Sequence, residues 1–236
     1  MYKTPLLQNH GLSRLFDATV LLKREDLQVV RFHKIRGAYH KMSTLPPIAG
    51  EREIVYASTG NHAQGVAYAC QLLSLKGCIF MPAQTPAQKV GKVRLFGKEY
   101  VEIILTGASF DDSFCAAKAF SDERGSTFIH PFDSLAIVEG QATAGQEILK
   151  AATVPIDYCF LPIGGVGWRP GVASVFRLLS PATELTGVQP LGAPSNARCY
   201  LEQPARGAGQ HRQLRGWRGG EVPRLAHGLA VPRAAR

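Results

Sequence analysis

Short apolar segments alternate with amphipathic segments from about residue 19 to residue 190 of the chain. The apolar segments predict seven strands, at residues 20–23, 53–57, 77–81, 100–105, 127–130, 158–162 and 184–188. Apolar positions with helical spacing predict six helices, at residues 34–42, 61–73, 86–96, 109–124, 134–151 and 171–179. This alternation, with strands that are apolar on both faces, predicts an α/β fold built on open, parallel sheets with flanking helices.

The helix predicted at residues 109–124 begins with a capping signature. Ser109 is followed three residues later by Asp112, which resembles a capping box. Phe110, Phe114 and Ala117 would then share one face of the helix.

The net charge of +9 is concentrated in the last part of the chain. Residues 197–236 contain eight Arg, no Lys and two Glu among many Gly, Ala and Pro, without a strand or helix period. This composition predicts a disordered tail, such as GC-rich DNA encodes in the absence of selection for a core. Binding of nucleic acid by Arg-Gly runs is the alternative. Only one aromatic residue, Trp217, lies within the Arg-Gly stretch, so nucleic-acid binding is not expected.

No apolar segment approaches the roughly 20 residues that cross a bilayer. The N-terminus lacks the basic and apolar regions of a signal peptide, so a cytoplasmic protein without a membrane partner is expected. Five scattered cysteines without a C-x-x-C pair suit neither a disulfide framework nor a zinc site, and no metal site is predicted.

Two segments carry residues suited to chemistry on an amino acid. Lys34 opens a predicted helix, and Ser58-Thr59-Gly60-Asn61 leaves a predicted strand and opens the next helix. A lysine amine can form a Schiff base with a cofactor aldehyde, and the amides of a glycine-containing turn at a helix start can hold an anion. Without a ligand, the lysine would be a solvated charge and the turn would be capped by Asn or Ser.

These segments belong to a series of six motifs. In chain order, the motifs are Thr4-Pro5-Leu6, Leu22-Lys23-Arg24-Glu25-Asp26, Lys34-Ile35-Arg36-Gly37-Ala38, residues 58–65, Glu139-Gly140-Gln141 and Gly164-Gly165. With this series, residues 4–196 resemble the threonine dehydratases, or threonine ammonia-lyases, among the fold-type-II pyridoxal phosphate enzymes, a group that includes serine racemase. The resemblance implies pyridoxal 5'-phosphate as cofactor, a small amino-acid substrate and the homo-oligomeric state common in relatives.

The resemblance also implies roles for single residues. Lys34 would carry the Schiff base and shuttle the α-proton of the substrate, and Asn61 would bind the ring hydroxyl of the cofactor. Glu139 would help to bind or position the substrate. The substrate carboxylate would lie against the turn formed by Ser58, Thr59, Gly60, Asn61 and His62, with His62 in a supporting role. The cofactor phosphate would lie in a cup formed by Gly164, Gly165, Val166 and Gly167.

Several positions depart from the family pattern. Phe32 and His33 stand where the family usually has Ser or Ala and then Phe or Tyr before the lysine. Val166 replaces the third glycine of the phosphate cup, and Trp168-Arg169-Pro170 stands where small residues are expected. Pro170 removes an amide donor near the start of the next helix.

By the same resemblance, an incomplete large domain would comprise residues 1–52 and 134–196, and a small domain would be inserted at residues 53–133. No counterpart is found after residue 196 for the strand that carries the polar partner of the pyridine nitrogen. Arg24, Glu25 and Asp26 are read as a structural ion-pair cluster.

The implied activity is deamination of L-threonine or L-serine to a 2-oxo acid and ammonia, a reaction of amino-acid metabolism and isoleucine biosynthesis. Two alternatives stay open. One is a serine racemase-like or hydroxyaspartate lyase activity, and the other is an inactive fragment that is truncated or altered in frame after residue 196.

Overall fold

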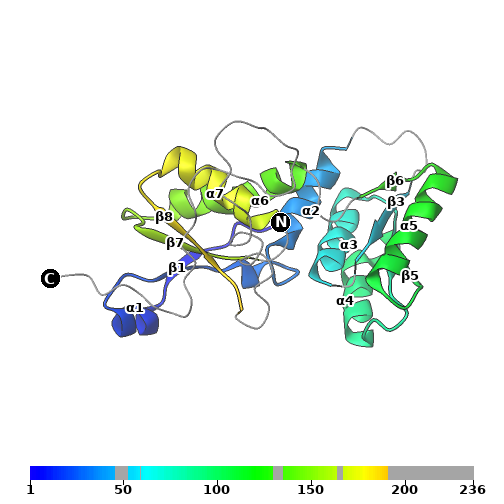
Figure 1. The fold of residues 1–236 in the computed structure, drawn as a ribbon, viewed down its shortest axis with the longest axis horizontal. Coiled ribbons are helices and arrows are strands. Elements are labelled where there is room, and N and C mark those ends of the chain that lie inside the picture. Colours follow the sequence, from blue (N-terminus) through cyan, green and yellow to red (C-terminus); the bar gives the residue numbers. More distant parts are fainter. Residues whose placement is uncertain (46–52, 59, 130–134, 164–166, 191–236) are drawn as a thin grey trace, which may run out of the picture. The chain divides into compact units, whose positions relative to one another are not determined.

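The computed structural model describes residues 1–45, 53–58, 60–129, 135–163 and 167–190 of the chain (Figure 1). Contacts between residues divide the chain into two compact units. Unit 1 comprises Met1–Thr4 and Arg24–Gln141, and unit 2 comprises Pro5–Lys23 and Ala142–Arg236. The tail predicted at residues 197–236 lies outside the described residues.

Unit 1 is built on a four-stranded parallel sheet with the order β5–β4–β3–β6. Its strands are β3 (Ile54–Ala57), β4 (Gly77–Met81), β5 (Val101–Leu105) and β6 (Thr127–Phe128). Its helices are α2 (Lys34–Ser43), α3 (Asn61–Leu73), α4 (Ala87–Gly97) and α5 (Phe110–Arg124), with short 3-10 turns η1 (Glu25–Leu27) and η2 (Lys98–Tyr100). The predicted α/β architecture is therefore confirmed.

Both faces of this sheet are covered by helices, which explains why its central strands are apolar throughout. Ile54 and Tyr56 of β3 pack with apolar residues of α2, α3 and α4, whereas Val55 and Ala57 pack with residues of α5. Successive residues of a strand point to opposite faces. Figure 1 accordingly shows α3 and α4 on one side of the sheet and α5 on the other.

Helix α5 begins with the capping box that the sequence predicts. The Ser109 hydroxyl accepts a hydrogen bond from the Asp112 amide at 3.1 Å, and the Asp112 carboxylate accepts one from the Ser109 amide at 2.9 Å. Two otherwise unpaired amides are satisfied in this way.

Unit 2 contains two small sheets. Strands β7 (Tyr158–Pro162) and β8 (Glu184–Val188) are parallel, and β1 (Leu6–Gln8) and β2 (Leu21–Lys23) are antiparallel. Its helices are α1 (His10–Phe16), α7 (Trp168–Leu179) and the second half of α6 (Leu135–Ala151), which crosses the unit boundary. The core of unit 2 is formed by Ala144, Ile148, Leu161, Trp168, Val172 and Phe176.

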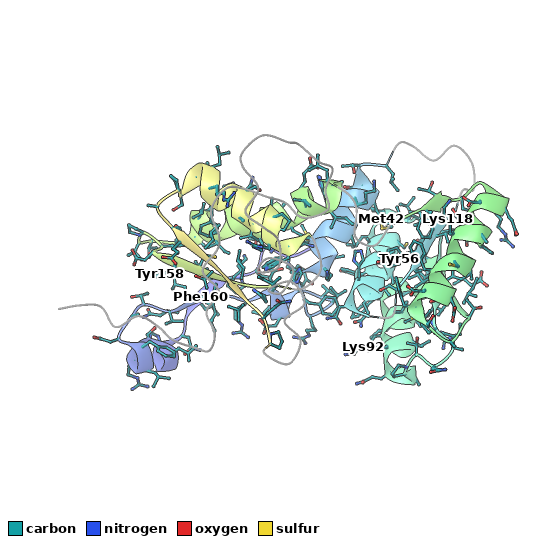
Figure 2. All side chains as sticks on the ribbon, in the orientation of Figure 1. Met42, Tyr56, Lys92, Lys118, Tyr158 and Phe160 are labelled. Carbon is teal, nitrogen blue, oxygen red and sulfur yellow. The ribbon has the colours of Figure 1, made fainter. Side chains whose placement is uncertain are left out.

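One face of β7 is open. Tyr158 and Phe160 are 47% and 53% exposed, and their rings stack with centroids 6.4 Å apart (Figure 2). Leu161, on the other face, is buried in the core of unit 2. The prediction of strands buried on both faces is therefore right for β3 and β4 and wrong for β7.

The start of the chain also differs from the prediction. Strand β2 joins no parallel sheet in the described residues and pairs antiparallel with β1, which the sequence did not predict. The sequence also missed α1, because its seven residues contain no buried side chain and therefore no apolar period. Local hydrogen bonds define this helix instead, since the Asn9 side chain caps it and Asp17 ends it in the left-handed conformation.

The compact units do not coincide with the predicted domains. Residues 24–45 and the start of α6 belong to unit 1 with the predicted small domain, because α2 packs on α3 and the start of α6 contacts α2. The division into residues 1–52 with 134–196 and residues 53–133 stays a prediction.

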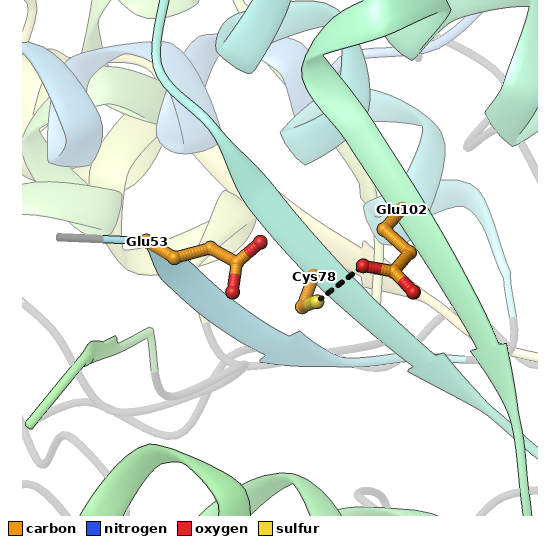
Figure 3. A group of neighbouring side chains, drawn as sticks. All are labelled: Glu53, Cys78 and Glu102. Carbon is orange, nitrogen blue, oxygen red and sulfur yellow. Dashed lines mark hydrogen bonds between the residues drawn. The ribbon is translucent and has the colours of Figure 1, made fainter. Parts of the chain in front are cut away.

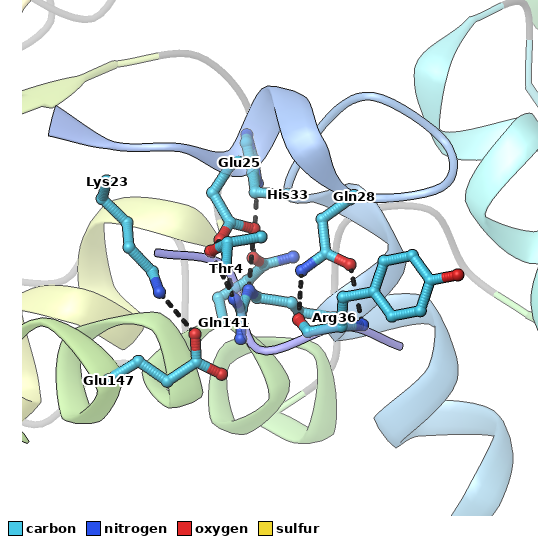
Figure 4. Close-up of polar contacts among 9 residues, drawn as sticks. Thr4, Lys23, Glu25, Gln28, His33, Arg36, Gln141 and Glu147 are labelled. Atoms are coloured by element: carbon cyan, nitrogen blue, oxygen red, sulfur yellow. Dashed lines mark hydrogen bonds and ion pairs between the residues drawn. The ribbon is translucent and has the colours of Figure 1, made fainter. Parts of the chain in front are cut away.

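A buried ion pair anchors the first turn of α2 (Figure 4). The guanidinium of Arg36 is fully buried and donates through Nε to Glu25 Oε2 and through Nη2 to Glu25 Oε1, each at 2.7 Å. The hydroxyl of Thr4 donates to Glu25 and accepts from Arg36. The sequence grouped Glu25 with Arg24 and Asp26, but those two residues pair with each other at the surface.

We expect Glu25→Ala to lower the free energy of unfolding by about 3–5 kcal/mol, because it leaves the buried Arg36 charge without a partner. Urea unfolding followed by circular dichroism measures the change. Asp26→Asn breaks the exposed pair next to it and serves as the control, with a much smaller effect. Equal losses for the two variants would contradict the importance of the buried pair.

Candidate active site around Lys34

Lys34 is the first residue of α2, and α3 passes close behind it. A Cβ atom added to Gly65 would lie 3.3 Å from the carbonyl carbon of Lys34 and 3.3 Å from the amide nitrogen of Ile35. Most Cβ contacts are longer, so residue 65 leaves little room for a side chain. The last glycine of the Asn61-to-Gly65 motif therefore brings α3 against the backbone of the lysine.

A second close approach joins the first turn of α2 to the start of α6. A Cβ atom at Gly140 would lie 2.5 Å from the carbonyl oxygen of Arg36 and 2.8 Å from Cα of Gly37. One at Gly37 would lie 2.8 Å from the side chains of Gln141 and Ile137. Only hydrogen atoms fit between these helices, so the two motif glycines have a packing role.

Gln141 connects the same turn to His33. With its amide oriented to satisfy both ends, Nε2 donates to His33 Nδ1 at 3.3 Å and to the His33 carbonyl at 3.2 Å, and Oε1 accepts from the Gly37 amide at 3.2 Å. His33 Nδ1 is then an acceptor, which places the ring proton on Nε2. The sequence gave no sign of this contact, because the two residues lie 108 positions apart.

The groups around Lys34 favour neutral forms. Lys34 is largely buried, and among the described residues its amine has no hydrogen bond or ion pair, so burial lowers its pKa. Burial, followed by the charge of Lys34, lowers the pKa of His33 to about 4. Burial and then Lys34 and His33 lower the pKa of His62 to about 3. Both imidazoles are therefore neutral at pH 7.

Both ring nitrogens of His62 are buried near this lysine and have no hydrogen-bond partner among the described residues. The ring of His62 meets the ring of Tyr56 edge to face, with centroids 5.1 Å apart and an angle of 84° between their planes. Buried polar groups are nearly always paired, so these two nitrogens are candidates for contact with a ligand.

The turn before α3 leaves its amides without a side-chain cap. Gly60 is the N-cap residue, and neither Ser58 nor Asn61 caps the helix. The alternative interpretation, in which Asn or Ser caps this turn in the absence of a ligand, is therefore wrong. Ser58 is buried and its hydroxyl accepts from the Gly60 amide at 3.4 Å, whereas Asn61 is exposed. Thr59 lies outside the described residues. Among the described residues, no side chain caps the positive end of this 13-residue helix, which is the end that favours an anion.

The structure pairs Glu139 with His40 rather than with Lys34. The Glu139 carboxylate lies 3.1 Å from His40 Nε2, and its side chain is 53% exposed on α6. Its predicted role in substrate binding stays a prediction.

The predicted phosphate cup is described only at its end. Gly164, Gly165 and Val166 lie outside the described residues, and Gly167 in unit 2 is the N-cap of α7. This helix begins at Trp168, three residues earlier than predicted, with Pro170 in its first turn. A proline is tolerated there because the amide it lacks would have no partner within the helix.

A separate group of potential ligands lies on the sheet of unit 1 (Figure 3). Glu53, Cys78 and Glu102 each offer an atom within 4.8 Å of the others, and the Cys78 thiol donates to Glu102 at 3.7 Å. Burial, together with the two carboxylates, raises the pKa of this thiol to about 12. The thiol therefore holds its proton and acts as a hydrogen-bond donor.

A family model described as "Pyridoxal-phosphate dependent enzyme" matches residues 1–235. The protein named L-threonine dehydratase biosynthetic IlvA of Halalkalibacterium halodurans is 52% identical over 192 residues, which are 81% of this chain and 46% of that protein. Its namesake in Bacillus subtilis is 47% identical over the same shares. The chain thus spans about half the length of the curated relatives it matches.

Solved structures agree with the fold. The processed form of threonine deaminase isoform 2 from Solanum lycopersicum superposes with a TM-score of 0.77 at 39% identity, over 82% of this chain and 52% of that one. Maize serine racemase gives a TM-score of 0.78 at 29% identity, over 85% of this chain and 60% of that one. The predicted fold-type-II architecture is confirmed. Within the part of the chain that the structure describes, no helix is both long and apolar enough to cross a membrane.

We expect acid to destabilise unit 1 through His33 and His62. The pKa of each imidazole is about 6.5 when exposed, and about 4 and 3 in the fold, so the unfolded chain binds more protons between these values. The free energy of unfolding should be highest above pH 6.5 and fall as the pH drops, by up to about 2 kcal/mol per histidine at pH 5.

Urea unfolding between pH 7.5 and pH 5 measures this slope. His62→Gln removes one of the two groups and should flatten the slope, whereas His10→Gln removes an exposed imidazole of α1 and controls for the loss of a histidine. A slope that is unchanged in His62→Gln would show that His62 is not held neutral by the fold.

Proposed function

Because the chain belongs to the family of pyridoxal-phosphate dependent enzymes, we propose that it carries the lysine-bearing half of an ammonia-lyase that deaminates L-threonine or L-serine. The observation that carries the proposal is the amine of Lys34, which is half-buried near His62 and has no hydrogen bond or ion pair among the described residues. A partly buried lysine without a charged partner loses its proton more easily than a surface lysine, and an amine must be neutral to act as a nucleophile.

The residues of unit 1 fit the cofactor. Lys34 would hold its aldehyde carbon, and the ring nitrogens of His62, which have no partner among the described residues, leave polar groups for a ligand to satisfy. Asn61 would hold the ring hydroxyl and the uncapped start of α3 would hold the substrate carboxylate. When bound, pyridoxal phosphate withdraws electrons from the substrate α-carbon. The phosphate ligands predicted at Gly164 to Val166 lie outside the described residues.

Lys34 Nζ would carry out the proton transfer. Once free, the neutral amine would take the α-proton, because burial favours its uncharged form. The protonated amine could then give this proton to the departing β-hydroxyl, which would leave as water, and the enamine product would add water to give a 2-oxo acid and ammonia. His33 and His62 stay neutral beside the lysine, so they add no positive charge of their own around its amine.

The dehydratase reaction is preferred to racemisation on sequence similarity. The dehydratase relatives share 52% and 47% identity with this chain, and the maize racemase shares 29%. The substrate, the homo-oligomeric state and the role of Glu139 are part of the proposal.

We expect purified chain mixed with pyridoxal phosphate to develop a visible absorbance band, and borohydride to fix the cofactor on Lys34, where peptide mass spectrometry locates it. Lys34→Ala should lose the band and the modified peptide. Lys41→Ala, on the same helix, should keep both. A chain that shows no band at saturating cofactor would be the inactive fragment that the alternative predicts.

A further inference from the structure

The side chain of Gln141, on α6, is buried and contacts the first turn of α2 (Figure 4). Two of its contacts are with backbone groups, in which donor and acceptor are unambiguous. The Gly37 amide is a donor and lies 3.2 Å from one end of the side-chain amide, and the His33 carbonyl is an acceptor and lies 3.2 Å from the other end. The side-chain oxygen therefore faces Gly37 and the side-chain nitrogen faces His33.

This orientation decides which ring nitrogen of His33 carries the proton. The amide nitrogen of Gln141 also lies 3.3 Å from His33 Nδ1, so one of its N–H groups donates to the carbonyl and the other to the ring. Nδ1 must accept, and the neutral ring is protonated on Nε2. In the reverse orientation Gln141 would accept from a protonated Nδ1 and raise the pKa of His33, but each backbone contact would then join two donors or two acceptors.

A second proton on this ring conflicts with its surroundings. An imidazolium carries N–H on both nitrogens, so Nδ1–H would point at the amino group of Gln141. The charged and titratable groups that act on the ring are Lys34 and Arg36 of α2, Glu25 of η1 and His62 of α3. Glu25 already pairs with Arg36, and the α6 carboxylate Glu139 pairs with His40. Protonation of Nδ1 would therefore cost the contact with Gln141.

The charge of this ring acts on Lys34, which is the next residue of the chain. A positive imidazolium repels a protonated amine, so it would lower the pKa of Lys34 further than burial alone does. A neutral imidazole has no such effect. The pH at which Lys34 becomes a nucleophile thus depends on which protonation state of His33 residue 141 permits.

We propose that Gln141 is a positioning residue of the Lys34 site, which holds His33 as the neutral ring protonated on Nε2 and thereby sets the pH range in which Lys34 captures the cofactor. Its effect on capture rests on the proposed function. The position of the ring proton does not, because it is a property of the chain without cofactor.

Nitrogen NMR of the full chain with isotope-labelled histidine locates the ring proton. The signals of His33 are those lost in His33→Phe. We expect an unprotonated Nδ1 and a protonated Nε2 at pH 7, and a protonated Nδ1 in Gln141→Glu, because a carboxylate only accepts. Gln146→Glu makes the same change at an exposed position of α6 and should leave the ring as in wild type. A protonated Nδ1 in wild type would overturn the proposal.

The effect on Lys34 is measured as the pH of half-maximal capture of pyridoxal phosphate, with borohydride fixation and peptide mass spectrometry. We expect Gln141→Glu to lower this pH by about one unit, because an imidazolium beside Lys34 disfavours the charged amine. Gln146→Glu should not change it. In the His33→Phe background Gln141→Glu should no longer lower this pH, since no ring nitrogen remains. An equal decrease with and without His33 would show that Gln141 does not act through it.

A second variant keeps the test decisive if Gln141→Glu does not fold. Gln141→Met removes the donor without adding charge, so the proton of His33 should distribute over both ring nitrogens. A ring that stays protonated on Nε2 alone would show that Gln141 does not hold it. If wild type captured no pyridoxal phosphate, the proposed function would fail and the effect on capture with it. Capture with the same pH dependence in wild type and Gln141→Glu would remove this inference alone.

Discussion

The ion pair between Arg36 and Glu25 is the constraint on which the geometry around Lys34 depends. Arg36 is fully enclosed, so its charge is tolerable only where both Glu25 oxygens and the Thr4 hydroxyl meet it. Lys34 lies two residues earlier in the same turn of helix, so placing the guanidinium also places the backbone of the lysine. A buried pair of this kind adds little net stability compared with apolar residues, but it permits only one arrangement of the turn.

Three residues from two other helices, α3 and α6, contact the same turn of α2. Gly65 of α3 lies against the backbone of Lys34, Gly140 lies against Arg36 and Gly37, and Gln141 bonds to His33 and Gly37. Motifs that are far apart in the chain are thus neighbours around one helical turn. Much of what marks the sequence as belonging to its family is the packing that holds the lysine, and only a smaller part is available to touch a ligand.

The sequence predicted the regular part of the fold well, because there the signal is local. Strands β4, β7 and β8 and helix α3 have the predicted bounds, and the Ser109 cap is confirmed. The short strand β1 and helix α1 were missed, since neither has enough buried positions for a period. Motif matching pointed to Lys34, which is half-buried in the structure, and to Ser58, which is buried.

The sequence does not predict which side chains around Lys34 form ion pairs and hydrogen bonds with one another. Nothing near Glu25 indicates that it pairs with Arg36 while both its neighbours face solvent, and nothing near His33 indicates that Gln141 bonds to it. Such pairings depend on how segments meet in three dimensions, and a period of 2 or 3.6 residues carries no information about that.

The contact between Gly37 and Gly140 has a consequence for how this chain can change over evolutionary time. A Cβ atom at Gly140 would collide with the backbone of Arg36 and Gly37, whereas one at Gly37 would first meet the side chains of Gln141 and Ile137. Tolerance at Gly140 therefore requires a helix backbone to move, which would also displace Arg36 and the lysine before it. Random mutagenesis should therefore recover few functional replacements at Gly140, even though this glycine is not among the residues proposed to bind the substrate.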